Sequence, residues 1–398
     1  STMNVYQGGK KMRILHTSDW HLGRIFHGVY LTDDQAHVLE QFIQLVADSR
    51  PDVILITGDI YDRSVPPTEA IKLLDEVLTR ILLDYKVPVV LIAGNHDSPD
   101  RLGFGAGLLA RQGLHLIGQL TDRLEPVVIP DTFGPVYFCP APYAEPPLVR
   151  ERLCAPGAVN HEQAMLSLIQ HLTASIPAGA RRVILAHAYV AGGEESESER
   201  PLSVGGSGSV SASLFHPFHY AALGHLHQPQ KAGWEHVRYA GSLLKYSFSE
   251  ASHRKSVALV EIDGAGKTAI ETIPLTPRRD VRRLEGYFAD IMSNAPEGGS
   301  RDDYIMVTLL DSGPIMDAIG RLREVYPNVL HLERPRLAAE GELRGPGGDH
   351  RQLNEAALFS SFFEQVTGTP LSEEESKALV ETLEGFYRKE RGEGHEAG

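Results

Sequence analysis

Short apolar runs that stop at a glycine or a polar residue recur along this chain, and they predict the buried strands of an α/β fold. The clearest run is 53–56, which is followed by Thr57, Gly58 and Asp59. A run this short, closed by glycine, is typical of a strand buried on both faces of a parallel sheet. Four further runs share this layout: 14–18, 89–93, 183–186 and 220–224.

Each of these runs ends next to an Asp, Asn or His. Because open α/β sheets bind their ligands beyond the carboxyl ends of the strands, we expect these side chains to meet at one site. Carboxylate, imidazole and amide ligands without a thiolate suit Mn²⁺ or Mg²⁺, so the pattern indicates a metal centre. Asp59 is the natural bridging carboxylate. The candidate residues at these strand ends are Asp19, His21, Asp59, Asn95, His96, Asp97, His187, His225 and His227.

Helical spacing of apolar residues separates the predicted strands. Helices are predicted over 33–49, 67–85 and 160–175. The order strand, helix, strand predicts right-handed crossovers. The 67–85 helix has apolar residues on two faces, which favours either simple packing on the sheet or an additional subunit contact.

The order of predicted strands and helices changes at 274–280, and beyond this point the sequence predicts smaller structural units. Residues 281–335 alternate between helix (284–292, 314–325) and strand (304–310, 329–333). We therefore expect a main domain over 12–280, a small α/β domain over 281–338 and a helical segment over 351–390, after a linker rich in glycine and charge. The last segment predicts two amphipathic helices, which either bind a partner helix pair or dock on the core. Their apolar stripes are Phe359, Phe362, Phe363 and Val366, then Leu379, Leu383, Phe386 and Tyr387.

Composition excludes several classes of protein. The 398 residues contain 42% hydrophobic and 23% charged side chains, which is ordinary for a soluble globular protein. No apolar run reaches the roughly 18 residues of a membrane span, and residues 1–11 lack the apolar core of a signal peptide. Only two cysteines are present, so a cytoplasmic location is expected. The net charge of −14 argues against nucleic-acid binding by the global field but leaves room for a local basic groove.

Two other stretches have plain interpretations. Gly266, Lys267 and Thr268 resemble the end of a phosphate-binding loop, but the glycine that this motif needs five residues earlier is Glu261. We interpret them as a turn. Residues 191–213 predict a mobile surface loop whose acidic run is solvated.

Five local stretches resemble the calcineurin-like metallophosphoesterases and, within them, the SbcD family of nuclease subunits. The stretches are 13–23, 58–62, 91–98, 222–227 and 236–242. Asp62 fits the bacterial branch of this family, because archaeal and eukaryotic relatives carry a histidine there. The resemblance implies a two-sheet α-β-β-α sandwich with a small α/β capping domain and C-terminal helices.

The same resemblance implies roles for single residues. One ion would be held by Asp19, His21, Asp59 and His227, and a second by Asp59, Asn95, His187 and His225. Two ions that share a carboxylate can activate a water and clamp an in-line phosphoryl displacement. His96 would face the scissile phosphate, and Asp97 would orient His96 through its ring nitrogen.

The family likeness also implies the activity. It is a Mn²⁺-dependent nuclease, with Mg²⁺ as an alternative ion, that degrades duplex DNA 3′ to 5′ and cuts single strands or hairpins. It would act as a homodimer, formed through the 67–85 helix and residues 102–109. Its C-terminal helices would bind an SbcC-type coiled-coil ATPase. A basic cluster would either contact DNA phosphates or be a solvated linker; its members are Arg278, Arg279, Arg282 and Arg283.

Two other functions compete with this one. A small-molecule phosphatase or phosphodiesterase of the same superfamily is disfavoured by the roughly 115 residues beyond Arg283. A non-catalytic scaffold is disfavoured because every ligand position is filled and His96 is present. To separate the nuclease from the small-substrate enzyme, one compares the rate of plasmid DNA cleavage with the rate of hydrolysis of a chromogenic phosphodiester.

Overall fold

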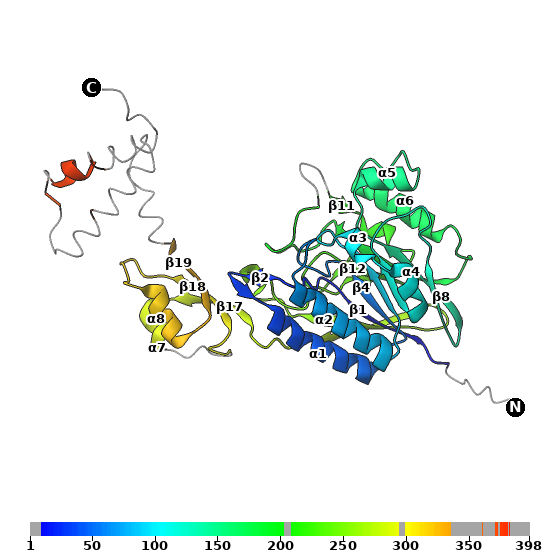
Figure 1. The fold of residues 1–398 in the computed structure, drawn as a ribbon, viewed down its shortest axis with the longest axis horizontal. Coiled ribbons are helices and arrows are strands. Elements are labelled where there is room, and N and C mark those ends of the chain that lie inside the picture. Colours follow the sequence, from blue (N-terminus) through cyan, green and yellow to red (C-terminus); the bar gives the residue numbers. More distant parts are fainter. Residues whose placement is uncertain are drawn as a thin grey trace, which may run out of the picture. The chain divides into compact units, whose positions relative to one another are not determined.

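The computed structural model describes residues 9–202, 208–293 and 299–335, with a few further positions at 360, 371–372, 375–380 and 382. The chain divides into two compact units, Ser1–Pro335 and Arg336–Gly398. The predicted helices over 351–390 lie almost entirely outside the described residues, and so do residues 1–8. The first unit is described below (Figure 1).

The first sheet contains the predicted strands that lead to Asp19, Asp59 and Asn95. Its six strands have the order β16-β15-β1-β4-β5-β6. The last four pair in parallel, whereas β15 and β16 are antiparallel neighbours at one edge. The strands are β1 (Met12–Thr17), β4 (Val53–Thr57), β5 (Val89–Ile92), β6 (Leu114–Ile117), β15 (Ser256–Ile262) and β16 (Thr268–Pro274).

The second sheet contains the strands that lead to His187 and His225. It also has six strands, in the order β13-β14-β12-β9-β8-β7, with a parallel centre and an antiparallel strand at each edge. The strands are β7 (Val127–Asp131), β8 (Gly134–Ala141), β9 (Arg181–His187), β12 (Tyr220–Gly224), β13 (Gln230–Ala232) and β14 (Trp234–Tyr239).

Strand alternation explains how the two sheets stack. Val53 and Leu55 point into a core shared with the second sheet, whereas Ile54 and Ile56 point into a core beneath helices. α1 (Thr32–Ser49) and α2 (Thr68–Thr79) pack together on this outer face (Figure 1). α5 (Pro146–Arg152) and α6 (His161–Thr173) cover the second sheet. The predicted α-β-β-α sandwich is confirmed.

The helix boundaries follow local chemistry. α1 ends at Arg50, whose left-handed backbone (φ 46°) closes the helix before Pro51. α2 begins directly after Pro67 and continues as one π-helical turn, Arg80–Asp84, so the predicted 67–85 helix is present in two parts. The side chain of Asn160 accepts a hydrogen bond from Gln163 N and so caps α6.

Short elements connect these layers. These short strands and helices are β2 (Ile25–Phe26), β3 (Val29–Tyr30), β10 (Tyr189–Val190), β11 (Ser209–Val210), α3 (Pro99–Leu102) and α4 (Ala106–Leu109).

Among the described residues no helix is long and apolar enough to cross a bilayer.

The small α/β part has its own apolar core and a three-stranded parallel sheet. Its elements are β17 (Val281–Gly286), α7 (Phe288–Ser293), β18 (Tyr304–Leu309), α8 (Ala318–Val325) and β19 (Val329–Glu333). The predicted helix over 284–292 is wrong in its first part, because Leu284 lies on β17 and pairs with Val307. Arg282 is half-buried on the same strand and pairs with Asp303, so a charged residue hides the strand pattern.

Candidate metal centre

The candidate ligands meet where the carboxyl ends of the two sheets come closest. β9 ends at His187, which pairs with Gly224 at the end of β12. A Cβ on Gly224 would collide with the carbonyl oxygen of Thr57 at the end of β4. Glycine therefore lets one sheet touch the other directly beneath the site.

Asp59 lies at the centre of the cluster and is almost fully buried. Its Oδ2 atom is 3.4 Å from His187 Nε2, 3.7 Å from His21 Nε2 and 3.9 Å from His96 Nε2. Its Oδ1 atom accepts a hydrogen bond of 2.9 Å from His96 N. One buried carboxylate thus faces three imidazoles, which is the environment expected of a bridging ligand.

The other predicted ligands lie on both sides of Asp59. Asp19, His21 and His227 form one group of close donor atoms, and His21 Nε2 faces His227 Nε2 at 3.0 Å. Asp19, Asp59 and His187 form another group, and Asn95 Oδ1 is 2.9 Å from His187 Nε2.

His225 joins the site mainly through its backbone. Its N–H lies 3.1 and 3.2 Å from the two Asp19 carboxylate oxygens, while its ring packs edge-on against His187. Burial holds the pKa of His225 well below its usual value, so the ring is neutral and has an available lone pair. Six of the seven predicted side chains therefore converge directly, and the seventh lies beside them.

Backbone strain is concentrated at these residues. Asp19, His21, Asp59 and His225 all have positive φ, at 51°, 45°, 50° and 109°. A non-glycine residue in this region costs energy, and such strain typically persists at functional sites where surrounding contacts enforce it. Here the contacts are backbone hydrogen bonds, from Asp19 N to Gly58 O and from His21 N to Asp59 O. The strained loops hold the ligands inward.

The donor set fits divalent cations. All of its atoms are nitrogen or oxygen, as hard and borderline ions prefer, and the side chains are buried. Buried His21 Nδ1 has no hydrogen-bond partner among the described residues, and the nearest carboxylate oxygen, Asp62 Oδ1, is 3.5 Å away. Closely packed carboxylates and imidazoles of this kind are stabilised when a cation lies among them.

His96 is oriented by a main-chain carbonyl. Its Nδ1 is 2.8 Å from the carbonyl oxygen of Asp62, so Nδ1–H donates there and Nε2 faces Asp59. Burial lowers the pKa of His96 to about 4, which keeps the ring neutral at pH 7.

The predicted role of Asp97 is wrong in its contacts. Its carboxylate accepts backbone hydrogen bonds from Gly94, Ile60 and Tyr61, at 2.9 to 3.1 Å. Three converging N–H groups satisfy this buried carboxylate, so it braces the loops that carry Asp59 and Asn95. The orienting group of His96 is the Asp62 carbonyl, which the sequence pattern could not indicate because every residue has one.

A network around His227 was not predicted. Ser198 Oγ lies 2.6 Å from His227 Nδ1, and Glu199 accepts a hydrogen bond from His227 N at 2.8 Å. Buried Glu250 lies 3.3 Å from the same ring nitrogen and pairs with Lys255, whose Nζ also donates to His227 O. Such partners fix the tautomer and orientation of a ligating histidine.

This network corrects the expectation for the 191–213 loop. Its acidic run is not simply solvated, because Glu199 contacts His227 and Ser198 is buried. Composition alone could not separate these residues from a solvated run, since their contacts join positions 28 to 52 residues apart.

A polar groove of about 370 Å³ opens beside the cluster. Arg24 lines it, donates to Asp62 at 2.8 Å and lies over the Tyr246 ring. Arg283, His27 and His331 also line it, together with the carboxylates of Glu197 and Glu333.

The structure does not gather the four predicted arginines of residues 278–283. Arg278 and Arg279 lie 3.9 and 3.8 Å from Asp33 and Asp34, and Arg282 is bonded to Asp303. Only Arg283 lines the groove among these four, so any DNA contact by the other three competes with an ion pair.

The comparisons with known proteins agree with this geometry. A family model described as calcineurin-like phosphoesterase matches residues 12–229, and one described as type 5 capsule protein repressor C-terminal domain matches residues 277–367. The SbcD subunit of the SbcCD nuclease of Staphylococcus saprophyticus is 33% identical over 372 residues, which cover 94% of this chain and 98% of that protein. Two solved structures, TT1561 of Thermus thermophilus and a dimetal phosphatase from Danio rerio, match with TM-scores of 0.38 and 0.39. Each is 16% identical and covers 66% of this chain and 99% of its own.

Metal binding should release protons at neutral pH. Burial alone would lower the pKa of His187, but the Asp59 and Asp19 carboxylates raise it to about 9. Below that pH an arriving ion must displace a proton, so affinity should rise as pH increases toward 9, by up to about tenfold per pH unit for one proton. Titration calorimetry of chelator-treated protein with Mn²⁺ at pH 7, in buffers of different ionisation enthalpy, measures the protons released. Binding without proton release would contradict this assignment.

Proposed function

The chain belongs to the SbcD family of calcineurin-like phosphoesterases, and from that membership and the buried cluster around Asp59 we propose that it is a Mn²⁺-dependent DNA nuclease. It is a metal-dependent phosphoesterase. The proposal adds that the substrate is DNA, cut 3′ to 5′ from duplex ends and endonucleolytically in single strands or hairpins. One observation carries it: a buried carboxylate among three imidazoles, next to a groove lined by arginine.

The ligand residues fit two divalent ions that share Asp59. Asp19, His21 and His227 would hold one ion with Asp59, and Asn95, His187 and His225 the other. Bound ions would supply a nucleophile at neutral pH and neutralise charge on the phosphate. Ser198, Glu199 and Glu250 hold the His227 ring and backbone in place for this task. Mn²⁺ is proposed because the site mixes imidazole with carboxylate, and Mg²⁺ is the alternative.

His96 would supply a proton to the leaving oxygen. The negative charge of a bound phosphodiester favours the imidazolium form. Nδ1–H then stays on the Asp62 carbonyl, and a proton on Nε2 faces the site centre. This arrangement explains why a residue with a low pKa before substrate binding can act as a general acid afterwards.

The groove beside the cluster supports a nucleic-acid substrate. The net charge of −14 opposes DNA binding by the whole surface, so phosphate contacts must be local. Arg24 Nη1 is held by Asp62 at 2.8 Å and its Nε atom is buried, whereas Arg283 forms no ion pair with a described residue. Arg283 is therefore the groove arginine that we place against the DNA backbone. A DNA substrate also agrees with the cytoplasmic location, which we expect because the chain has only two cysteines.

The name of the family relative supports one protein partner, and exposed apolar side chains support a second. Its name describes a subunit of a nuclease, and we propose that this chain likewise assembles with an SbcC-type coiled-coil ATPase through residues 351–390. We also propose a homodimer through the 67–85 segment, which comprises α2 and the π-helical turn after it, and residues 102–109. Supporting this, Leu83, Phe104 and Leu108 are exposed at 63%, 84% and 78%. A contiguous apolar patch typically marks an interface, and we assign these three side chains to it.

Substitution of the catalytic histidine should abolish DNA cleavage without removing the metal. We expect His96→Ala to lower Mn²⁺-dependent degradation of linear duplex and circular single-stranded DNA by about 10²- to 10⁴-fold, the usual contribution of a general acid. His236→Ala, at a histidine that bonds only the His216 carbonyl, is the matched control. Metal content is measured in parallel. Hydrolysis of a chromogenic phosphodiester by wild type, with no cleavage of any DNA even after the ATPase is added, would favour the small-molecule enzyme instead.

The dimer surface has its own test. Phe104→Glu with Leu108→Glu should convert the dimer to a monomer in sedimentation velocity, because two buried charges without partners oppose association. Met316→Glu, at an exposed apolar residue of the small α/β part, should leave the mass unchanged. A wild-type monomer at micromolar concentration would rule out the dimer, and a dimer that survives both substitutions would place its contact elsewhere.

A further inference from the structure

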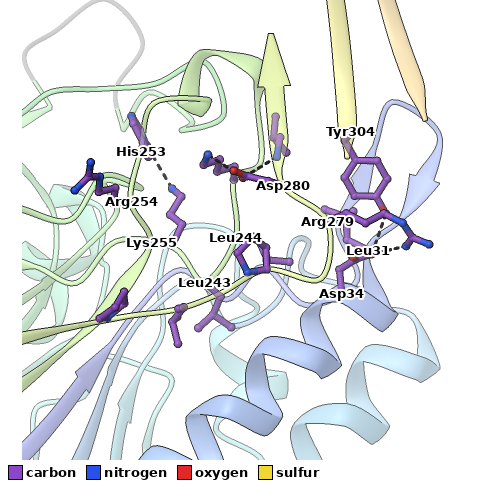
Figure 2. A pocket seen from close by; sticks show the side chains of 15 residues that line it. Leu31, Asp34, Leu243, Leu244, His253, Arg254, Lys255, Arg279, Asp280 and Tyr304 are labelled. Atoms are coloured by element: carbon purple, nitrogen blue, oxygen red, sulfur yellow. Dashed lines mark hydrogen bonds and ion pairs between the residues drawn. The ribbon is translucent and has the colours of Figure 1, made fainter. Parts of the chain in front are cut away.

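A cavity of about 230 Å³ lies where the main sandwich meets the small α/β part (Figure 2). Residues of α1, of the segment 243–255 and of β17 and β18 line it. Its walls are mostly apolar. The apolar side chains that form them are Leu31, Leu243, Leu244, Leu275, Val281 and the Tyr304 ring. None of these residues is a metal ligand, so the cavity is separate from the candidate centre.

Asp34 brings an unusual polar group to this apolar wall. The residue is 2% exposed and lies in the first turn of α1. Its Oδ2 atom accepts a hydrogen bond of 2.9 Å from Tyr304 Oη and is 3.8 Å from Arg279 Nη1. Its Oδ1 atom has no hydrogen-bond partner among the described residues. A buried carboxylate oxygen without a donor is costly, and native structures rarely leave one so.

Among the other charged groups of the wall, Arg254 forms no ion pair with a described residue, whereas the two lysines are matched. Lys255 Nζ donates to His227 O, Ser242 Oγ and Glu250 Oε2, which uses its three protons. Lys245 pairs with Asp280 at 2.8 Å and donates to Ala251 O. In Figure 2, Asp34, Arg279 and Tyr304 stand together on one side, and His253 and Lys255 on the other, with Leu244 between. Asp34 Oδ1 is therefore an unsatisfied acceptor in this wall, which a hydrogen-bond donor would match, whereas an anion would find only Arg254 unpaired among the described lining residues.

The volume of the cavity limits the size of the ligand. An apolar cavity of about 150 Å³ accommodates benzene, so about 230 Å³ suits one bicyclic ring system with a short side chain. We propose that this cavity is a binding site for a small aromatic amine, whose ring lies among the leucines and whose N–H group donates to Asp34 Oδ1.

The position of the site links it to both parts of the first unit. Tyr304 and Val281 belong to the small α/β part, and Asp34 to the main sandwich. Lys255, on the opposite wall, holds His227 O and Glu250. A ligand here would favour the arrangement in which these contacts are made. Any effect on DNA cleavage rests on the proposed nuclease function, but binding itself does not.

The experiment uses tryptamine as the probe and indole-3-acetate as its anionic match. Binding to the full chain is followed by titration calorimetry and by ligand-observed NMR. We expect saturable tryptamine binding to wild type, and at least tenfold weaker binding of indole-3-acetate. Asp34→Asn should weaken tryptamine binding at least tenfold. Asp33→Asn is the matched control, because its side chain is 86% exposed on the same helical turn, and it should bind as wild type does.

A second variant keeps the test decisive if Asp34→Asn misfolds. Leu244→Phe adds bulk to the cavity wall without changing Asp34, and it should weaken tryptamine binding as well. The proposal is overturned if wild type shows no saturable binding, if the amine and the carboxylate bind equally, or if neither Asp34→Asn nor Leu244→Phe weakens binding. None of these readouts requires nuclease activity, so failure here and failure of the nuclease assignment remain distinguishable.

Discussion

The buried Asp59 carboxylate is the constraint on which the rest of this molecule depends. Burial alone would raise its pKa, but the His187 and His21 imidazoles hold it well below the usual range. A charge at this depth needs opposite charge beside it, and the fold supplies the surrounding groups from both sheets. The close approach at Gly224 and the strained backbone at Asp19, His21 and Asp59 all serve this convergence.

Much of the fold and of the candidate metal centre could be predicted from the sequence, because their sequence signals are local. Runs such as 53–56 carry a strand pattern, and polar residues at their ends must gather at one edge of a parallel sheet. The exceptions involve contacts between distant segments. Leu284 lies on a strand because β17 pairs with β18, and the charged Arg282 on the same strand has its partner, Asp303, 21 residues away. The family resemblance implies that Asp97 orients His96, yet backbone N–H groups satisfy its carboxylate. Ser198, Glu199 and Glu250 carried no motif.

Contacts between distant segments also decide which arginines are free to bind DNA. This matters because the net charge of the chain opposes binding of the proposed substrate. Three of the four arginines at 278–283 face carboxylates, and they tie the small α/β part to α1 or to its own loops. Arg24 and Arg283 remain at the groove. Of these four arginines, three therefore hold parts of the chain together, and Arg283 is left for substrate. The junction so formed also contains the Asp34 cavity, which makes it both a structural joint and a candidate ligand site.

The central claim is that Asp59 is shared by two metal ions. Crystals grown with Mn²⁺ and measured at the manganese absorption edge test it most directly, because anomalous scattering locates the ions without reference to activity. The account predicts two anomalous peaks, one on each side of the Asp59 carboxylate. One would lie near His21 and His227, and the other near Asn95 and His187. A single peak, or peaks that leave Asp59 without an ion, would contradict it.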